Sequence, residues 1–224
     1  MLNKSNKIVY KNQNKTSVKK NILKEIVNFI GLTIIPMYLV IILSSILIIV
    51  FKKINMENTF TSKLLITWFG LGSSFVAIPY LYLRKKYLLK RTEVGLNQIS
   101  KTEFVIISFL LIILYIVLAI KAKISYLFII ATIQNLGVAL SEEFYVKGIL
   151  FYQARRIYNN SIFIVILSTL VFSFVLHNSN SIINNVIYRV PMGLITSIIY
   201  LKTKKIYMPV AIHFIYDMLF TSLF

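Results

Sequence analysis

The chain has 224 residues, of which 58% are hydrophobic, with a mean hydropathy of +0.77 and a formal net charge of +18. Soluble domains are ordinarily about 45–50% apolar, so this composition excludes a soluble globular protein and favours a polytopic membrane protein. The basic residues flank apolar runs, so membrane topology explains the positive charge without any nucleic-acid partner. The chain has no cysteine, which excludes disulfides and thiolate chemistry.

Three units are predicted along the chain. Residues 1–26 form a cytoplasmic basic tail rich in lysine and asparagine, residues 27–121 hold N-terminal transmembrane spans, and residues 122–224 form a transmembrane core with the residues suited to catalysis. The apolar runs predict spans at 27–51, 64–83, 104–120, 125–153, 162–177, 182–201 and 206–224. The predicted fold is therefore all-α, a polytopic transmembrane helical bundle of about seven spans.

The distribution of lysine and arginine predicts the orientation of these spans. Basic residues concentrate in the tail and in the segments 84–101, 155–156 and 202–205, and they are sparse in the alternate connections. Loops rich in lysine and arginine stay in the cytosol. We therefore expect a multi-pass protein of the cell membrane, with the lipid bilayer as its partner, the N-terminus in the cytosol and the C-terminus outside.

Acidic residues and histidines are rare in this chain, and their placement is selective. There are seven acids and two histidines, and the apolar C-terminal segments contain Glu142, Glu143, His177, His213 and Asp217. A charge at the bilayer centre costs about 2.5–3.5 kcal/mol on insertion scales, so such residues are usually partnered and functional. The chemistry of the protein is therefore expected in its C-terminal half.

Helical spacing groups these side chains further. Glu143 and Lys147 are four residues apart, as are His213 and Asp217, so each pair is predicted to share a helix face. Glu142 then points elsewhere and is free to meet His177 and His213. A carboxylate beside two imidazoles predicts a water-activating site, with Glu142 as general base and a histidine that stabilises the oxyanion or protonates the leaving amine.

Two other interpretations stay open at this point. Glu142, His177 and His213 are also a plausible ligand set for a divalent metal such as Zn²⁺, although the chain has no His-Glu-x-x-His motif. The buried Glu–Lys and His–Asp pairs also have a purely structural interpretation, in which they hold neighbouring helices together. The metal-free site is the preferred prediction, and it requires no cofactor.

The motifs resemble those of a known family of intramembrane endopeptidases that process CAAX proteins and bacteriocins, the type II CAAX prenyl endopeptidases. The segment from Glu142 to Lys147 is similar to the family's Glu-Glu-x-x-x-Arg motif, His177 to its second-motif histidine, and the segment from His213 to Asp217 to its His-x-x-x-Asn/Asp motif. The resemblance covers residues 136–220. It implies a hydrolase of peptide bonds with its active site inside the bilayer, either metal-dependent or with a glutamate that activates water.

Two positions depart from the family pattern. Lys147 stands where the family usually has arginine, which keeps the charge but loses the bidentate fork. Ser173 stands four residues before His177, where the family usually has phenylalanine, and Phe172 and Phe174 lie on either side of it.

The predicted function is an intramembrane endopeptidase. Its expected substrate is a membrane protein or a peptide precursor, such as a bacteriocin, a signalling peptide or a CAAX-like protein. In this prediction Lys147 orients Glu143 and Asp217 orients His213. The departures at Lys147 and Ser173 motivate the alternative, a catalytically silent member of the same family that acts as a membrane immunity or scaffold protein.

Overall fold

A computed structural model describes residues 4–56, 59–121 and 126–223. Within these ranges the chain is helical with no strand, which confirms the all-α prediction. The α-helices are α1 (Lys4–Lys53), α2 (Phe60–Leu71), α3 (Ile78–Tyr87), α4 (Lys101–Lys121), α5 (Tyr126–Glu143), α6 (Phe151–Ile157), α7 (Ser161–Leu170), α8 (Ile182–Asn184), α9 (Val190–Thr203) and α10 (Tyr207–Leu223). A 3₁₀ turn at Arg91–Val94 and π-helical segments at Gly72–Ala77, Phe144–Leu150, Val171–Leu176 and Asn185–Arg189 complete the described secondary structure.

Polar side chains start several of these helices, as the sequence favours. The Thr59 side chain accepts a hydrogen bond from the backbone N–H of Ser62 at the start of α2, and Asn160 accepts one from Phe163 at the start of α7. Such caps satisfy backbone donors that have no partner within the helix.

Four helical segments of the described chain are long and apolar enough to cross a membrane. They are Asn21–Lys53, Phe60–Tyr87, Lys101–Ile120 and Ile182–Thr203. Two shorter apolar helices, Ser161–Leu176 and Tyr207–Phe220, match further predicted spans, but they fall short of the ~20 residues that a perpendicular crossing needs. The structure thus confirms a transmembrane helical protein, and the number of seven crossings stays a prediction.

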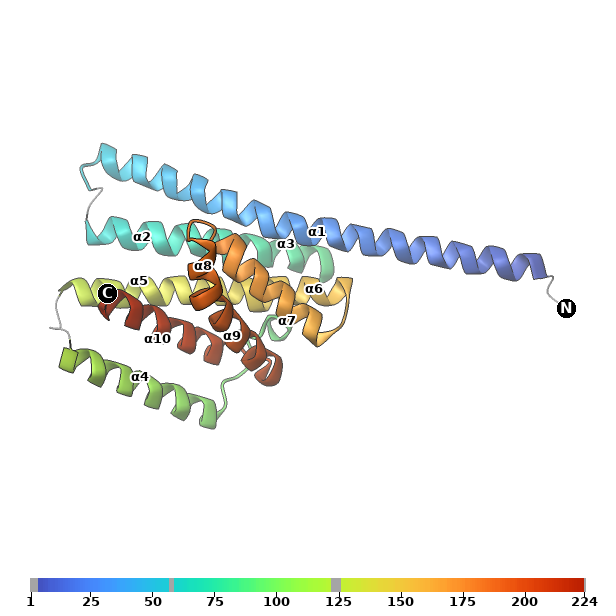
Figure 1. Ribbon diagram of the computed structural model, residues 1–224. Coiled ribbons are helices and arrows are strands. Elements are labelled where there is room, and N and C mark those ends of the chain that lie inside the picture. Colours follow the sequence, from blue (N-terminus) through green and yellow to red (C-terminus); the bar gives the residue numbers. More distant parts are fainter. Residues whose placement is uncertain (1–3, 57–58, 122–125, 224) are drawn as a thin grey trace.

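The basic tail predicted for residues 1–26 is helical from Lys4 onward. It continues without a break into the first predicted span, because α1 runs from Lys4 to Lys53 with Pro36 inside it. In Figure 1 the N-terminal part of this helix extends well beyond the other helices.

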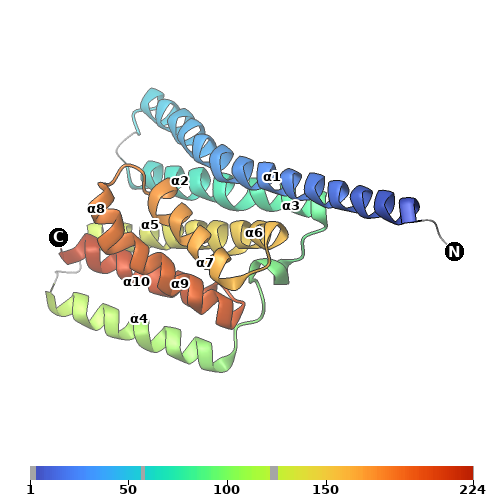
Figure 2. The same ribbon diagram turned by 45° about the vertical axis from the view of Figure 1, so that its right-hand side comes forward.

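Most of the helices lie side by side in one layer, and three further helices pack across one face of that layer. Figures 1 and 2 show α1, α2 with α3, α5 with α6, α10, and α4 side by side in that order, while α7, α8 and α9 lie across one face. The helix that carries the acidic motif is therefore central. Every residue from Ser141 to Phe151 is buried, so the charged motif lies inside the protein and does not face lipid.

Contacts from the neighbouring helices fix the orientation of this central segment. The Tyr145 ring stacks on Phe75, which follows α2, at a centroid distance of 4.7 Å. The Tyr145 hydroxyl donates to the backbone carbonyl of Leu32 in α1. Aromatic pairs of this kind add about 0.5–1.5 kcal/mol beyond the area they bury, so the turn after the acidic motif is held from two sides.

Candidate active site

The structure brings Glu142 and the two histidines together. His177 Nε2 lies 3.4 Å from Glu142 Oε2, and His213 Nε2 lies 3.9 Å from the same oxygen. The three side chains come from the last turn of α5, the end of the π-helical segment after α7, and α10. Side chains from three distant segments therefore lie within 4 Å of one carboxylate oxygen.

His213 is the most connected member of this group. Its Nδ1 lies 3.0 Å from Glu143 Oε1, and both side chains are fully buried. Its Nε2 lies 3.3 Å from Asp217 Oδ2, one helical turn further along α10. The predicted His213–Asp217 pair is thus present. Each ring nitrogen of His213 lies beside a carboxylate, and the two carboxylates limit rotation of the ring.

Arg189 is a member of the site that the sequence did not assign. Its Nη1 lies 3.5 Å from Asp217 Oδ1, so it completes a chain from Arg189 through Asp217 to His213. A signal was present, because Arg189 is a cation inside the apolar run 182–201. Charged residues in such runs usually have a partner nearby.

Lys147 does not make the ion pair with Glu143 that the sequence predicts. Its ammonium donates instead to Ser197 Oγ at 2.9 Å and to Ser168 Oγ and the Gly193 carbonyl at 3.4 Å. Lys147 is fully buried, so these acceptors on α7 and α9 replace the water that its charge loses. Its role is therefore to tie the acidic helix to α7 and α9, while His213 takes the place of Lys147 as the partner of Glu143.

A π-helical segment contains Ser173, the position four residues before His177 where the family usually has phenylalanine. In the segment Val171–Leu176 hydrogen bonds run over five residues, and His177 directly follows this segment. The Phe172 ring meets His177 edge to face at 5.0 Å and His213 at 5.5 Å. Phe172 thus supplies the aromatic contact that the family pattern places four residues before the histidine, and Ser173 is turned into the protein with no exposed surface.

Comparison with known families agrees with this geometry. Residues 124–219 match the family model described as type II CAAX prenyl endopeptidase Rce1-like. That stretch contains all six residues predicted for the site. Neither the curated proteins nor the solved structures gave a match. At the level of the family, this match supports a membrane endopeptidase. It identifies neither a substrate nor a catalytic mechanism.

Where the three segments of the site meet at Glu142 Oε2, that oxygen and the two imidazole nitrogens nearest to it have no hydrogen-bond partner. They are Glu142 Oε2, His177 Nε2 and His213 Nε2, and all three are buried. Most buried polar atoms are paired, so a group of unpaired ones points to a small polar ligand between them. A water molecule that donates to the carboxylate and accepts from an imidazole satisfies such a group.

The same atoms bear on the metal hypothesis. Two imidazole nitrogens and a carboxylate are chemically suited to zinc. His213 Nε2, however, lies closer to Asp217 (3.3 Å) than to Glu142 (3.9 Å). Among the residues that the structure describes, no group of three or more His, Cys, Asp or Glu has the geometry to hold a metal ion. Metal binding by Glu142, His177 and His213 stays a prediction.

A cavity of about 490 Å³ leads to Glu142. Its walls are apolar side chains from α1, from the end of α2 and from the segment before His177, together with Asn178. The α1 wall is on the surface of the bundle, since Ile34 is 47%, Tyr38 64% and Ile41 61% exposed. Glu142 therefore lines a largely apolar cavity whose α1 wall includes residues exposed on the surface of the bundle.

Proposed function

We propose that the chain is an intramembrane endopeptidase that hydrolyses a peptide bond in a membrane protein or a peptide precursor, with Glu142 as the base. The observation that carries the proposal is the group of three unpaired buried atoms, one of which belongs to Glu142, a residue that lines a largely apolar cavity. A substrate segment that lies in the bilayer has a direct path to this cavity. A soluble peptide lacks the apolar surface that the α1 wall would contact.

Each residue then has a defined part in the reaction. Glu142 Oε2 takes a proton from water as the water oxygen attacks the carbonyl carbon, and the resulting oxyanion accepts hydrogen bonds from the imidazoles of His177 and His213. The protonated Glu142 next delivers the proton to the leaving nitrogen, and the C–N bond breaks. The products are a new carboxyl terminus and a new amine.

Glu143 and Asp217 act through His213. They lie within 3.0 Å and 3.3 Å of its two ring nitrogens, on opposite sides of the imidazole. A carboxylate that holds a catalytic imidazole fixes the orientation of the ring and stabilises its positive charge. We therefore assign Glu143 and Asp217 as positioning residues, with Arg189 supporting Asp217.

The proposal is tested by hydrolysis in isotopically labelled water. The purified full chain is reconstituted in proteoliposomes with synthetic peptides that carry an apolar segment of about 20 residues or a C-terminal prenyl group, in water enriched in oxygen-18. We expect cleavage that places one heavy oxygen in each new carboxyl terminus, read by mass spectrometry. Absence of cleavage in every peptide class would favour the silent immunity or scaffold alternative.

A chelator distinguishes the two catalytic possibilities. Because no group of three or more His, Cys, Asp or Glu among the described residues has metal-holding geometry, we expect 1,10-phenanthroline and EDTA to leave the cleavage rate within about twofold of the untreated value, a change too small for loss of an essential metal. The metal content of the active protein is measured in parallel. A stoichiometric bound metal, with activity lost on chelation and restored by zinc, would contradict the metal-free mechanism.

The cavity wall on α1 offers a matched pair of variants. Ile41 lines the cavity, whereas its neighbour Ile42 does not, and both are exposed (61% and 52%). We expect Ile41→Trp to fill part of the cavity and lower kcat/KM for a membrane peptide by about 10-fold or more. The side chain at position 42 faces lipid, so Ile42→Trp should leave kcat/KM unchanged. Equal effects of the two variants would show that the cavity is not the substrate path.

A further inference from the structure

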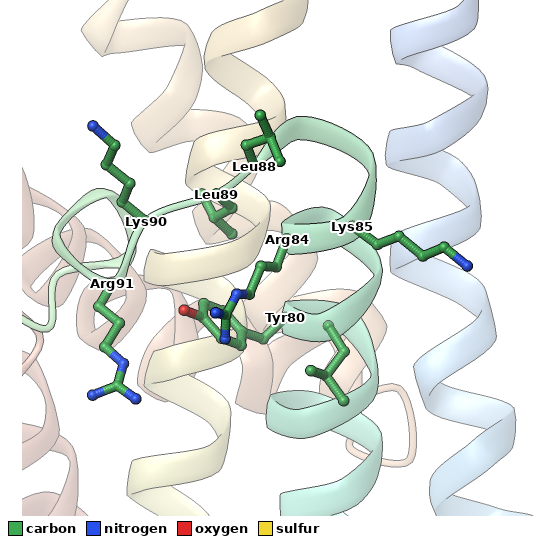
Figure 3. A pocket seen from close by; sticks show the side chains of 8 residues that line it. Tyr80, Arg84, Lys85, Leu88, Leu89, Lys90 and Arg91 are labelled. Atoms are coloured by element: carbon green, nitrogen blue, oxygen red, sulfur yellow. The ribbon is translucent and has the colours of Figure 1, made fainter.

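A second cavity, of about 860 Å³, lies at the C-terminal end of α3 and is lined by none of the predicted site residues. It is lined by Tyr80, Leu81, Arg84, Lys85, Leu88, Leu89, Lys90 and Arg91 (Figure 3). Four of these eight residues are cationic and none is acidic. The proposed proteolysis makes no use of this cavity.

The cationic side chains around this cavity are not neutralised by the protein. In the described part of the chain, no carboxylate forms a salt bridge with Arg84, Lys85, Lys90 or Arg91. The nearby Glu93 accepts a hydrogen bond from the backbone N–H of Lys90 and does not line the cavity. Positive charge gathered in a concave site attracts an anion from outside.

The two arginines are better placed than the two lysines to bind an anion in this cavity. Figure 3 shows Arg84 and Arg91 directed to the Tyr80 side of the cavity, whereas Lys85 and Lys90 point away to opposite sides. The planar guanidinium of arginine matches the oxygens of a phosphate group and binds them with two parallel hydrogen bonds. The arrangement thus suits a phosphate group held by Arg84 and Arg91, with the lysines further out.

The walls of the cavity are fixed to the helix that bears Glu142. The Tyr80 ring meets Phe144 edge to face at 6.1 Å, and Phe144 directly follows the acidic motif. On the other side, Leu89 and Val94 are buried, and a Cβ placed on Gly148 would lie only 3.1 Å from the Val94 carbonyl. A cavity with both walls packed in this way is formed before a ligand arrives, which reduces the entropy lost on binding.

Exposed leucines beside the cations indicate where the phosphate comes from. Leu81 is 58% and Leu88 82% exposed. Leu88 ends α3 in the left-handed region with a φ of 56°, a conformation that is unusual for a bulky side chain. Leu81 lies within the last two turns of the candidate span Phe60–Tyr87, and Leu88 directly follows it. The end of a span is the level at which headgroups and acyl chains meet. A free phosphate ion would not contact them.

We propose that this cavity binds the phosphate headgroup of an anionic phospholipid, with Arg84 and Arg91 on the phosphate and Leu81 and Leu88 against its acyl chains. The lipid is a bound ligand of the protein, in a site formed by α3 and the turn that follows it. Juxtamembrane cations attract anionic lipids in general. The cavity, its unpaired arginines and its exposed leucines distinguish a specific site from that general attraction.

The test uses the full chain purified in an uncharged detergent. Thermal unfolding and native mass spectrometry are recorded with dioctanoyl phosphatidylglycerol, with dioctanoyl phosphatidylcholine and with inorganic phosphate at matched concentrations. We expect phosphatidylglycerol to bind and raise the unfolding temperature, because a ligand that binds only the folded state stabilises it. The double variant R84Q/R91Q should bind this lipid about 30-fold more weakly.

Two double variants with the same loss of charge serve as controls. K85Q/K90Q alters the cations that point away from the cavity and should weaken binding less than R84Q/R91Q. K52Q/K53Q alters exposed cations at the end of α1 and should bind as the wild type. Equal lipid binding by R84Q/R91Q and the wild type would overturn the proposal. It would also be overturned by a shift in unfolding temperature from phosphatidylcholine or inorganic phosphate as large as that from phosphatidylglycerol.

Discussion

Glu142→Gln is expected to lower the cleavage rate by about 10²- to 10⁴-fold, the contribution that a positioned general base makes. The fold should survive, because glutamine is nearly isosteric and Glu142 Oε2 makes no hydrogen bond that the change would break. The amide has no basic oxygen able to take the proton from water, so the chemical step is lost while the cavity keeps its shape. The cleavage rate of a membrane peptide in proteoliposomes measures this effect.

The matched control for this variant is Glu103→Gln. Glu103 pairs with Lys205 at the surface of the bundle and caps the start of α4 through Ser100. Its replacement removes the same charge without touching the site, so we expect wild-type cleavage. If the Glu142→Gln variant cleaves as fast as the Glu103→Gln variant, Glu142 is not the general base. Glu143 would then be the next candidate for that role.

Much of the site followed from the sequence because its residues are rare. With two histidines and seven acids in 224 residues, the conjunction of Glu142, His177 and His213 in apolar segments left little choice of partner. The i,i+4 rule also placed Asp217 beside His213 correctly. Rarity and helical spacing are properties of the sequence, so these predictions did not depend on how the helices pack.

The errors share a physical cause. Helical spacing says which side chains can meet, but it does not say which partner a long side chain chooses among several neighbours. Lys147 therefore contacts Ser168 and Ser197 from other helices in place of Glu143. The π-helical segment that aligns Phe172 with His177 has no signature in local composition. Arg189 acquires its partner Asp217 only through the packing of two helices.

For the fold, too, some features could be predicted from the sequence and others could not. Hydropathy located the apolar helices, because each needs a continuous apolar stretch. It did not fix how many are long enough to cross the membrane alone, since Ser161–Leu176 and Tyr207–Phe220 are short. Nor did it show that the segment from Ser141 to Phe151 is buried on all sides, because burial by neighbouring helices and burial in lipid select the same residue types.

His213→Ala is expected to destabilise the protein by about 3–5 kcal/mol, the range for removing one partner of a buried charged pair. Glu143 is fully buried, and its Oε2 already lacks a hydrogen bond. Loss of His213 Nδ1 therefore leaves the whole carboxylate without a partner in the protein interior. His177→Ala is the comparison, since His177 is partly exposed and its Nε2 lies 3.4 Å from Glu142 Oε2 without a hydrogen bond. Its effect on stability should be clearly smaller. Thermal unfolding in detergent measures both.

A double-mutant cycle separates the lost charge pair from simple loss of packing. If the buried Glu143 charge is the cause, Glu143→Gln in the His213→Ala background removes that charge and should recover part of the stability. The double variant would then be more stable than His213→Ala alone, although it carries one more substitution. If the two substitutions instead add, the cost arises from the cavity left among Phe172 and its neighbours. Because the readout is unfolding and not cleavage, the result assigns the Glu143–His213 pair independently of any substrate.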